Sequence, residues 1–208
     1  MKTYHKIQTL FKRNPETNFK TLLLYQYALP EFEYLKSNIW TFTEKVDGTN
    51  IRIIIHPDGS VEFRGKTDRA QIQKQLLRRL GELFLDNGKL AKQFPDGACL
   101  YGEGYGAKIQ KGGGNYSPTQ EFVLFDIKVG DWWLERFNVC KVADTLKLRV
   151  VPAVDIGTLA DMVTIVRSGL DSMWGHFPAE GIVARPEVEL FDRNGDRIIT
   201  KLKCKDFK

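Results

Sequence analysis

The segment TFTEKVDGTNIRIIIHPDGSVEF (Thr41–Phe63) decides how the first half of the chain folds. Apolar residues alternate with polar ones through much of it, which is typical of half-buried β-strands. The Asp-Gly pair in HPDGSVEF is a hairpin signal between two extended runs, Ile51–His56 and Val61–Arg64. The segment therefore predicts a β-hairpin.

Lys45, in the same segment, precedes a Val-Asp-Gly corner. A glycine in a turn allows a nucleotide phosphate to approach the backbone closely. Two interpretations are open at this point. Lys45 is either a solvated lysine at a strand end, which is the ordinary case in a basic protein, or a nucleophile.

The rest of the chain alternates strand pairs with a few helices. A helical repeat of apolar residues covers about Asp68–Asp86, with Thr67 or Asp68 as its cap and Gly88 as its end. The other expected elements are a short strand entering a glycine-rich loop in CLYGEGYG, a hairpin in FVLFDIKVGDWWL, helices near Glu135–Leu148 and Thr158–Leu170, a strand in EGIVARP, and a hairpin in VELFDRNGDRIITKLKCK turned at Asn194-Gly195. This order lacks βαβ alternation, so it predicts an α+β fold with mainly antiparallel sheets and disfavours a Rossmann domain.

Bulk properties narrow the class of protein. The 208 residues carry a net charge of +5 and a pI of about 9.0, which suits a polyanionic partner such as nucleic acid or nucleotide phosphate. Cys99, Cys140 and Cys204 show neither metal-ligand spacing nor a disulfide framework. No apolar run approaches membrane-spanning length, and MKTYHKIQTLFKRN lacks the apolar core of a signal peptide. We expect a cytoplasmic protein.

Several side chains outside the first segment can also carry chemistry. Lys201 and Lys203 are two residues apart on an expected strand, so both face the same side of the sheet. A lysine attacks only after losing its proton, and nearby cations favour that loss. Glu103 and Glu180 each open a Glu-Gly pair beside a strand, where a carboxylate can bind a ribose hydroxyl or a hard metal ion. The alternative is an exposed basic strand end and two glutamates in turns.

Phe125 and Arg64 are more ambiguous. Phe125, in VLFDI, is surrounded by apolar residues, so it is either part of the core or a platform for a purine ring. Arg64, in FRGKTDR, is either a phosphate or ribose contact or a strand-end cation.

The order of these residues resembles a known superfamily. KVDGTN, LYGEGYG, FVLFDI, EGIVARP and ITKLKCK follow one another in the order of motifs I, III, IIIa, IV and V of the covalent nucleotidyltransferases, which include polynucleotide ligases and mRNA capping enzymes. DNA ligases and capping enzymes usually carry arginine where this chain has Asn50. With Glu44 before Lys45, the stretch EKVDGTN is similar to the RNA ligases typified by the second RNA ligase of phage T4 and the trypanosome editing ligases. YHKIQTLFKRN, GEGYGAKIQKGGGNY and VGDWWLER look closer still to small phage proteins related to the animal 5′-3′ RNA ligases.

This resemblance implies the nucleotidyltransferase fold and an ATP-dependent RNA ligase that joins 5′-phosphate and 3′-OH ends of RNA through lysyl-AMP and AppRNA. It also implies a role for each motif residue. Lys45 would be the nucleophile, Lys201 and Lys203 would bind the α-phosphate, and Glu180 would bind Mg²⁺ or Mn²⁺. The remaining expected ATP contacts are Glu44 and Phe125 at the adenine, Arg64 and Glu103 at the ribose, and Asn50 at the phosphates or ribose.

The resemblance also implies a domain organisation. We expect residues 1–208 to form one adenylation domain, without the C-terminal OB-fold or helical domain of larger ligases. RNA docking would then fall to this domain or to an accessory partner. Candidate contacts are Lys6, Lys12, Arg13, Lys108 and Lys111, each of which is otherwise a solvated cation. Gly112–Gly114 would form a mobile loop, and one of Trp132 and Trp133 would be exposed. The competing functions are a DNA ligase, a capping-type guanylyltransferase and a non-catalytic nucleotide- or RNA-binding relative.

Overall fold

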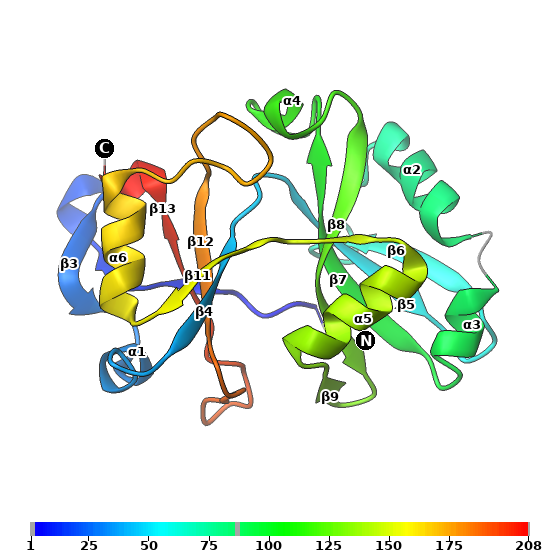
Figure 1. The fold of residues 1–208 in the computed structure, drawn as a ribbon, viewed down its shortest axis with the longest axis horizontal. Helices are drawn as coiled ribbons and strands as arrows, with labels where there is room; N and C mark the ends of the chain where they lie inside the picture. The colour runs from blue at the N-terminus through cyan, green and yellow to red at the C-terminus, as the bar shows by residue number, and fades with distance from the viewer. Residues whose placement is uncertain (1–2, 86–87, 208) are drawn as a thin grey trace. The chain divides into compact units, whose positions relative to one another are not determined.

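The computed structural model describes residues 3–85 and 88–207, and the chain divides into two compact units (Figure 1). The first unit contains the N-terminal residues up to Tyr4 together with Asp47–Val151. The second contains His5–Val46 and Pro152–Lys208. The expected α+β class, with mainly antiparallel sheets, is confirmed.

The first unit is built on a six-stranded sheet. The strands follow one another in the order β10 (Arg149–Val150), β8 (Gln120–Val129), β7 (Ala98–Gly106), β5 (Thr49–Ile55) and β6 (Val61–Gly65), with β9 (Trp132–Trp133) paired to β8. Strand β10 runs parallel to β8, and the other pairs between described strands of this sheet are antiparallel. The unit also contains the helices α2 (Lys74–Phe84), α3 (Lys89–Gln93), α4 (Gly113–Tyr116) and α5 (Arg136–Leu146).

One face of this sheet carries the core of the first unit. Ile51, Ile53 and Ile55 alternate along β5, and each is fully buried in a cluster that includes residues of α2 and α5. Because side chains alternate between the two faces of a strand, the residues between these isoleucines point to the opposite face. That opposite face carries polar side chains, among them Asn50 and Glu103.

The glycines of LYGEGYG lie inside β7 rather than in a loop, so the expected glycine-rich loop is wrong. Gly102 and Gly104 occupy core-facing positions where neighbouring side chains press against the strand. A Cβ at Gly102 would lie 2.2 Å from the ring of Phe122, and one at Gly104 would lie 2.4 Å from the side chain of Leu76. The glycines therefore make room for helix and sheet packing, while Glu103 between them faces the other way.

The second unit is built on a five-stranded sheet. Its strands lie in the order β1 (Gln8–Thr9), β13 (Thr200–Lys203), β12 (Gly181–Pro186), β4 (Trp40–Glu44) and β11 (Ala153–Gly157). Beside it are the two-stranded pair β2 (Phe11–Arg13) and β3 (Leu22–Tyr27), the helices α1 (Pro30–Tyr34) and α6 (Leu159–Ser168), and the 3₁₀ turns η1 (Pro15–Thr17) and η2 (Cys204–Phe207). Buried Trp40, Phe42, Ile182 and Leu202 pack in one cluster with Met162 of α6.

Most expected elements are found. The hairpins turned at Gly59 and Gly130 form as β5–β6 and β8–β9, and the helices near residues 135–148 and 158–170 correspond to α5 and α6. Helix α6 begins with a capping box, in which Thr158 and Asp161 satisfy each other's backbone N–H groups. Among the described residues, no helix has the length and apolar character needed to cross a membrane.

Two expected boundaries are wrong. Helix α2 begins at Lys74 and not at Asp68, because the Asp68 carboxylate accepts a hydrogen bond from buried Arg52 at 2.6 Å and the chain from residue 68 to 73 is irregular. The helix ends at Phe84, and Gly88 instead precedes α3. Asp86, the expected last residue, lies outside the described part.

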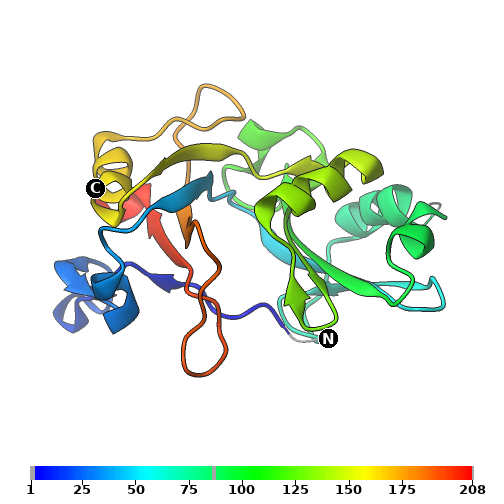
Figure 2. The same cartoon turned by 60° about the horizontal axis from the view of Figure 1, so that its bottom comes forward.

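The expected C-terminal hairpin also forms only in part. Residues 187–197 make a loop closed by one bridge, between Phe191 and Arg197, and this loop projects from the sheet of the second unit (Figure 2). Strand β13 pairs instead with β12 and β1. The segment between β12 and β13 therefore contributes a turn at Asn194-Gly195 but no long strand.

Candidate active site

Two lysines that are far apart in the sequence meet at one end of the second unit's sheet. Ile182 of β12 pairs with Glu44 of β4 on one side and with Leu202 of β13 on the other. One residue further, at the same end of all three strands, stand Lys45 and Lys203. Because strand pairing sets register residue by residue, the backbone alone aligns these two lysines.

Glu180, the residue before β12, lies between them. Its carboxylate is 2.5 Å from the Lys45 ammonium and 2.6 Å from the Lys203 ammonium. The three side chains are partly buried, with exposed fractions of 21%, 13% and 24% for Lys45, Glu180 and Lys203. For ion pairs buried to this degree, the cost of removing the charges from water offsets much of their attraction, so this cluster is better suited to holding charges in position than to holding the fold together.

Lys201 belongs to the same face of β13 as Lys203. It is half-buried, whereas Leu202 between them is fully buried on the core side. The expected i, i+2 arrangement of the two lysines on one face is therefore confirmed.

Strand β13 lies so close to position 181 that only glycine, which has no Cβ, fits there. A Cβ at this position would lie 2.0 Å from the carbonyl oxygen of Leu202. The Gly181 carbonyl also accepts the backbone N–H of Lys45 at 2.9 Å. The glycine of the Glu-Gly pair thus lets three strands converge next to the Glu180 carboxylate.

Glu44 is held inside the second unit. The residue is 2% exposed, and its carboxylate accepts a hydrogen bond from the Ser172 hydroxyl at 2.6 Å and one from the Met173 N–H at 2.7 Å. Burial raises the pKa of Glu44, and the two hydrogen bonds partly oppose that effect. No sequence pattern points to Ser172 or Met173, because their contacts with Glu44 depend on a loop that folds back onto β4.

The turn of KVDGTN continues into the first unit. There, a Cβ at Gly48 would lie 2.2 Å from the carbonyl oxygen of Gly104, so β7 rather than a ligand accounts for the glycine. The Gly48 carbonyl accepts a hydrogen bond from the Gln110 amide at 2.9 Å, and the Asp47 N–H donates to the Tyr116 hydroxyl at 3.4 Å. The turn is therefore fixed by its own unit.

The polar motif residues of the first unit share the sheet face opposite to the core. Asn50 of β5 pairs directly with Glu103 of β7. The Asn50 side-chain oxygen is buried and makes no hydrogen bond to the described residues. An unsatisfied buried acceptor is unusual and is consistent with a polar ligand at this face.

Arg64 reaches the same face from β6, where it pairs with Arg52 of β5. Its guanidinium contacts the Glu62 carboxylate and donates to the Asp68 carbonyl at 3.3 Å. Arg64 therefore contacts a residue of its own edge strand and one of the segment that follows this strand.

Phe125 is the extra residue of a β-bulge. Tyr101 pairs with Asp126 and Gly102 pairs with Leu124, so Phe125 has no partner in the register of β7 and β8. Leu124 and Asp126 are fully buried, whereas Phe125 is half-buried and meets Tyr4 edge-to-face at 5.2 Å between ring centroids. Bulges re-aim side chains, and this one turns a phenylalanine out of the core-facing pattern.

The residues expected to contact RNA differ in their exposure to solvent. Four of the five basic candidates are exposed, namely Lys6, Lys12, Lys108 and Lys111. Arg13 instead pairs with Asp206 at 2.9 Å. Trp132 is 80% exposed and Trp133 half-buried, as expected.

The expected mobile loop at Gly112–Gly114 is instead part of a packed turn. Gly113 is buried in α4, where a Cβ would lie 2.0 Å from the carbonyl oxygen of Gly106. This region also supplies Tyr116 to the turn of KVDGTN.

In the described part of the chain, Glu180 is the carboxylate that lies beside the paired lysines. Among residues 3–85 and 88–207, no group of three or more histidine, cysteine or acidic side chains is placed to bind a metal ion. The Glu180 carboxylate is itself bound to Lys45 and Lys203. A hard divalent cation that takes its other ligands from phosphate oxygens and water would fit this donor set.

The fold is shared with solved RNA ligase structures. A Naegleria gruberi RNA ligase variant with ATP and Mn matches 97% of this chain and 56% of its own, with a TM-score of 0.70 and 17% identity. A second variant, with ATP and Mn, has a TM-score of 0.67 and 16% identity, and the match covers 99% of this chain and 63% of the other. A third, with AMP and Mn, has a TM-score of 0.67 and 18% identity, and the match covers 98% of this chain and 57% of the other. This chain therefore spans less than two thirds of the length of those proteins.

The sequence itself matches the RNA ligase family over residues 38–203, which is well over half of the chain. The chain belongs to the RNA ligase family. Among curated proteins, no sequence match was found.

Proposed function

We propose that the protein is an ATP-dependent RNA ligase that works through a lysyl-AMP intermediate on Lys45. The observation that carries the proposal is the cluster of Lys45, Glu180 and Lys203 at aligned strand ends, in a chain of the RNA ligase family. The similar Naegleria gruberi structures with ATP or AMP and Mn support nucleotide and divalent-cation use. On the motifs, we assign the protein to the branch of the second RNA ligase of phage T4 and the animal 5′-3′ RNA ligases.

The proposed reaction has three steps. Deprotonated Lys45 Nζ attacks the α-phosphorus of ATP, a P–N bond forms, the α–β anhydride bond breaks, and pyrophosphate leaves. An oxygen of the RNA 5′-phosphate then attacks the same phosphorus, which breaks the P–N bond and gives AppRNA. The RNA 3′-OH finally attacks the 5′-phosphorus, so that a phosphodiester forms and AMP leaves. Such phosphoryl chemistry depends mainly on positioning and charge neutralisation.

The residues of the second unit supply the reactive end of the site in this proposal. Lys203 and Lys201 bind the α-phosphate, where two cations on one strand face can meet a single anionic group. In the structure the Glu180 carboxylate orients Lys45 and Lys203 by accepting from both. Mg²⁺ or Mn²⁺ bound with ATP would neutralise phosphate charge and compete with Lys45 for that carboxylate. Glu44 is assigned to the adenine and is oriented by Ser172.

The residues of the first unit are assigned to ATP as well, by their motifs. Asn50 offers an unsatisfied amide oxygen to a phosphate-proximal or ribose hydroxyl group. Glu103, which faces it across the strand pair, and Arg64 are assigned to the ribose. Phe125 is assigned to the adenine ring as a stacking platform, which its half-buried position in a bulge allows. RNA ends are the proposed partners, with an accessory RNA-binding protein as a further one.

The decisive test is formation of the lysyl adduct. Purified protein incubated with [α-³²P]ATP and Mg²⁺ should become labelled, and mass spectrometry should place an AMP-sized addition on Lys45. Lys45→Ala should abolish the label. Lys45→Arg is the matched control, because it keeps a cation beside Glu180 yet cannot act as the nucleophile.

Parallel reactions with GTP and NAD, followed by sealing of nicked and single-stranded RNA and DNA, separate the competing functions. Labelling by GTP alone would point to a guanylyltransferase, and sealing restricted to DNA would point to a DNA ligase. A label that persists in Lys45→Ala would overturn the assignment of the nucleophile.

A further inference from the structure

A polar hollow of about 490 Å³ lies in the first unit, and none of the residues assigned to ATP lines it. Among its lining residues, Arg79 comes from α2, Glu121 from β8, and Lys147 and Arg149 from the end of α5 and the start of β10. Three cations therefore face one carboxylate. A hollow of this size and charge fits an anionic ligand.

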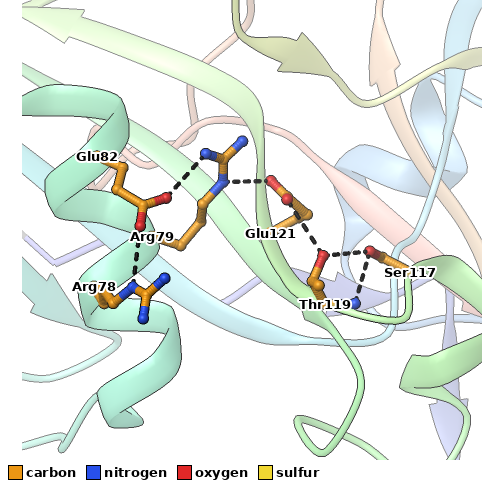
Figure 3. A network of polar contacts seen from close by, with 6 residues as sticks. All are labelled: Arg78, Arg79, Glu82, Ser117, Thr119 and Glu121. Carbon is orange, nitrogen blue, oxygen red and sulfur yellow. Dashed lines mark hydrogen bonds and ion pairs between the residues drawn. The ribbon is translucent and has the colours of Figure 1, made fainter.

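Arg79 is fixed in place by a polar network (Figure 3). Its Nε donates to Glu121 at 2.9 Å, and its Nη1 donates to Glu82 at 3.3 Å. These contacts raise the pKa of Arg79 and leave its Nη2 group without a partner among the described residues. A guanidinium held on two sides with a third side open is pre-organised to donate to a phosphate oxygen.

Lys147 and Arg149 add two cations that are not neutralised. Both side chains are exposed, they flank buried Leu148, and neither makes an ion pair with a described residue. Lys147 also adopts the left-handed conformation (φ 57°) at the C-terminus of α5, where glycine is the usual residue. Its presence in that position places a positive charge at the rim of the hollow despite the backbone preference.

The hollow shares a wall with the turn that follows Lys45 in sequence. Tyr116 lines it, and the hydroxyl of Tyr116 accepts the backbone N–H of Asp47. Tyr105, also in the wall, meets Tyr116 edge-to-face at 6.2 Å. A strand bound in the hollow would therefore lie one side chain from the KVDGTN turn.

We propose that this hollow is a binding site for the phosphodiester backbone of the RNA strand to be joined. The inference rests on the proposed ligase function and assigns its RNA-docking surface to Arg79, Lys147 and Arg149. Backbone phosphates bound by these cations would release counterions, so the interaction is salt-dependent and independent of base sequence.

The test uses the intact chain and a fluorescent, 5′-phosphorylated single-stranded RNA, titrated at several KCl concentrations. The variant is Lys147→Asn with Arg149→Gln, since asparagine tolerates the left-handed conformation. The matched control is Lys89→Gln with Lys92→Gln, which removes the same charge from α3. Helix α3 precedes the start of β7, whereas Tyr105 of the hollow lies near the end of that strand. Labelling by [α-³²P]ATP is measured on all three proteins.

The hollow variant should bind RNA roughly tenfold more weakly near 150 mM salt, with a salt slope smaller by about 1.4, because each phosphate contact on a single strand contributes about 0.7. Its labelling by ATP and the RNA affinity of the control should match the wild type. An unchanged RNA affinity and slope, or equal weakening in the control, would refute the site. Loss of labelling with RNA binding intact would also refute it, because the cations would then act on ATP or pyrophosphate. If the wild type forms no adduct, the proposed function fails while the RNA titration still decides the site.

Discussion

The ammonium of Lys45 lies 2.5 Å from the carboxylate of Glu180, although 135 residues separate them in the sequence. The contact follows from strand register, because β4 and β12 pair so that Lys45 stands opposite the residue after Glu180. The same carboxylate binds Lys203. Each side chain at this end of the sheet thus depends on the others for its position.

Glu180→Gln should impair adenylylation far more than it impairs folding. The substitution removes the charge shared by Lys45 and Lys203 but keeps the shape of the side chain. We expect label transfer by the folded protein to fall roughly 100-fold or more, whereas the free energy of unfolding should fall by no more than about 1–3 kcal/mol, the cost of leaving partly buried polar groups without a partner. Glu187→Gln, an exposed site in the same unit, is the control. A large loss of stability with normal labelling of the folded protein would mean that Glu180 is structural.

The buried carboxylate of Glu44 predicts a pH-dependent difference in stability. Because burial raises its pKa above the ordinary 4.5, the folded chain binds this proton more tightly than the unfolded chain does. The contribution of Glu44 to stability is therefore most favourable below pH 4.5 and declines as pH rises through its folded-state pKa. Glu44→Gln lacks this titration.

Thermal melts of both proteins from pH 4 to 8 measure this effect, since other titrating groups cancel in the difference. The melting temperature of Glu44→Gln minus that of the wild type should increase with pH and then level off. The lost acceptor for Ser172 or Met173 adds only a constant offset. A difference that is flat or that falls with pH would contradict the raised pKa.

Gly181→Ala should disturb the lysine cluster through the backbone. The new methyl group would overlap the Leu202 carbonyl, so β12 and β13 must separate or distort, at a cost of about 1–3 kcal/mol. Both the melting temperature and label transfer should fall. Gly114→Ala is the control, because no atom lies within 4 Å of its added Cβ. Wild-type behaviour of Gly181→Ala would show that the strands approach less closely than described.

Phe125→Ala distinguishes a stacking ring from a core residue. Loss of a base-stacking contact costs about 1–3 kcal/mol, so ATP binding should weaken roughly 5- to 150-fold while stability changes little. Phe122→Ala, in the same strand but 3% exposed, should instead lower the free energy of unfolding by about 3–5 kcal/mol. Melting curves beside ATP titrations measure both. If Phe125→Ala melts like Phe122→Ala and binds ATP normally when folded, the ring belongs to the core.

By itself, the sequence determined the local elements and the residue types of the candidate site. Alternation and turn residues predicted the β5–β6 and β8–β9 hairpins, because strand side chains and tight turns obey short-range rules. The order of the motifs pointed to the RNA ligase family. The i, i+2 spacing of Lys201 and Lys203 predicted their common face, which the structure confirms.

Only the tertiary structure decided which of these residues meet and why the glycines stand where they do. The Lys45–Glu180–Lys203 cluster comes from pairing between strands that are distant in sequence. The start of α2 depends on Asp68 contacting Arg52, and Ser172 reaches Glu44 through a loop. The glycines at 102 and 104 make room for residues from other elements. Periodicity reports only neighbours within one element, whereas register, bulges and close packing are set by contacts between elements.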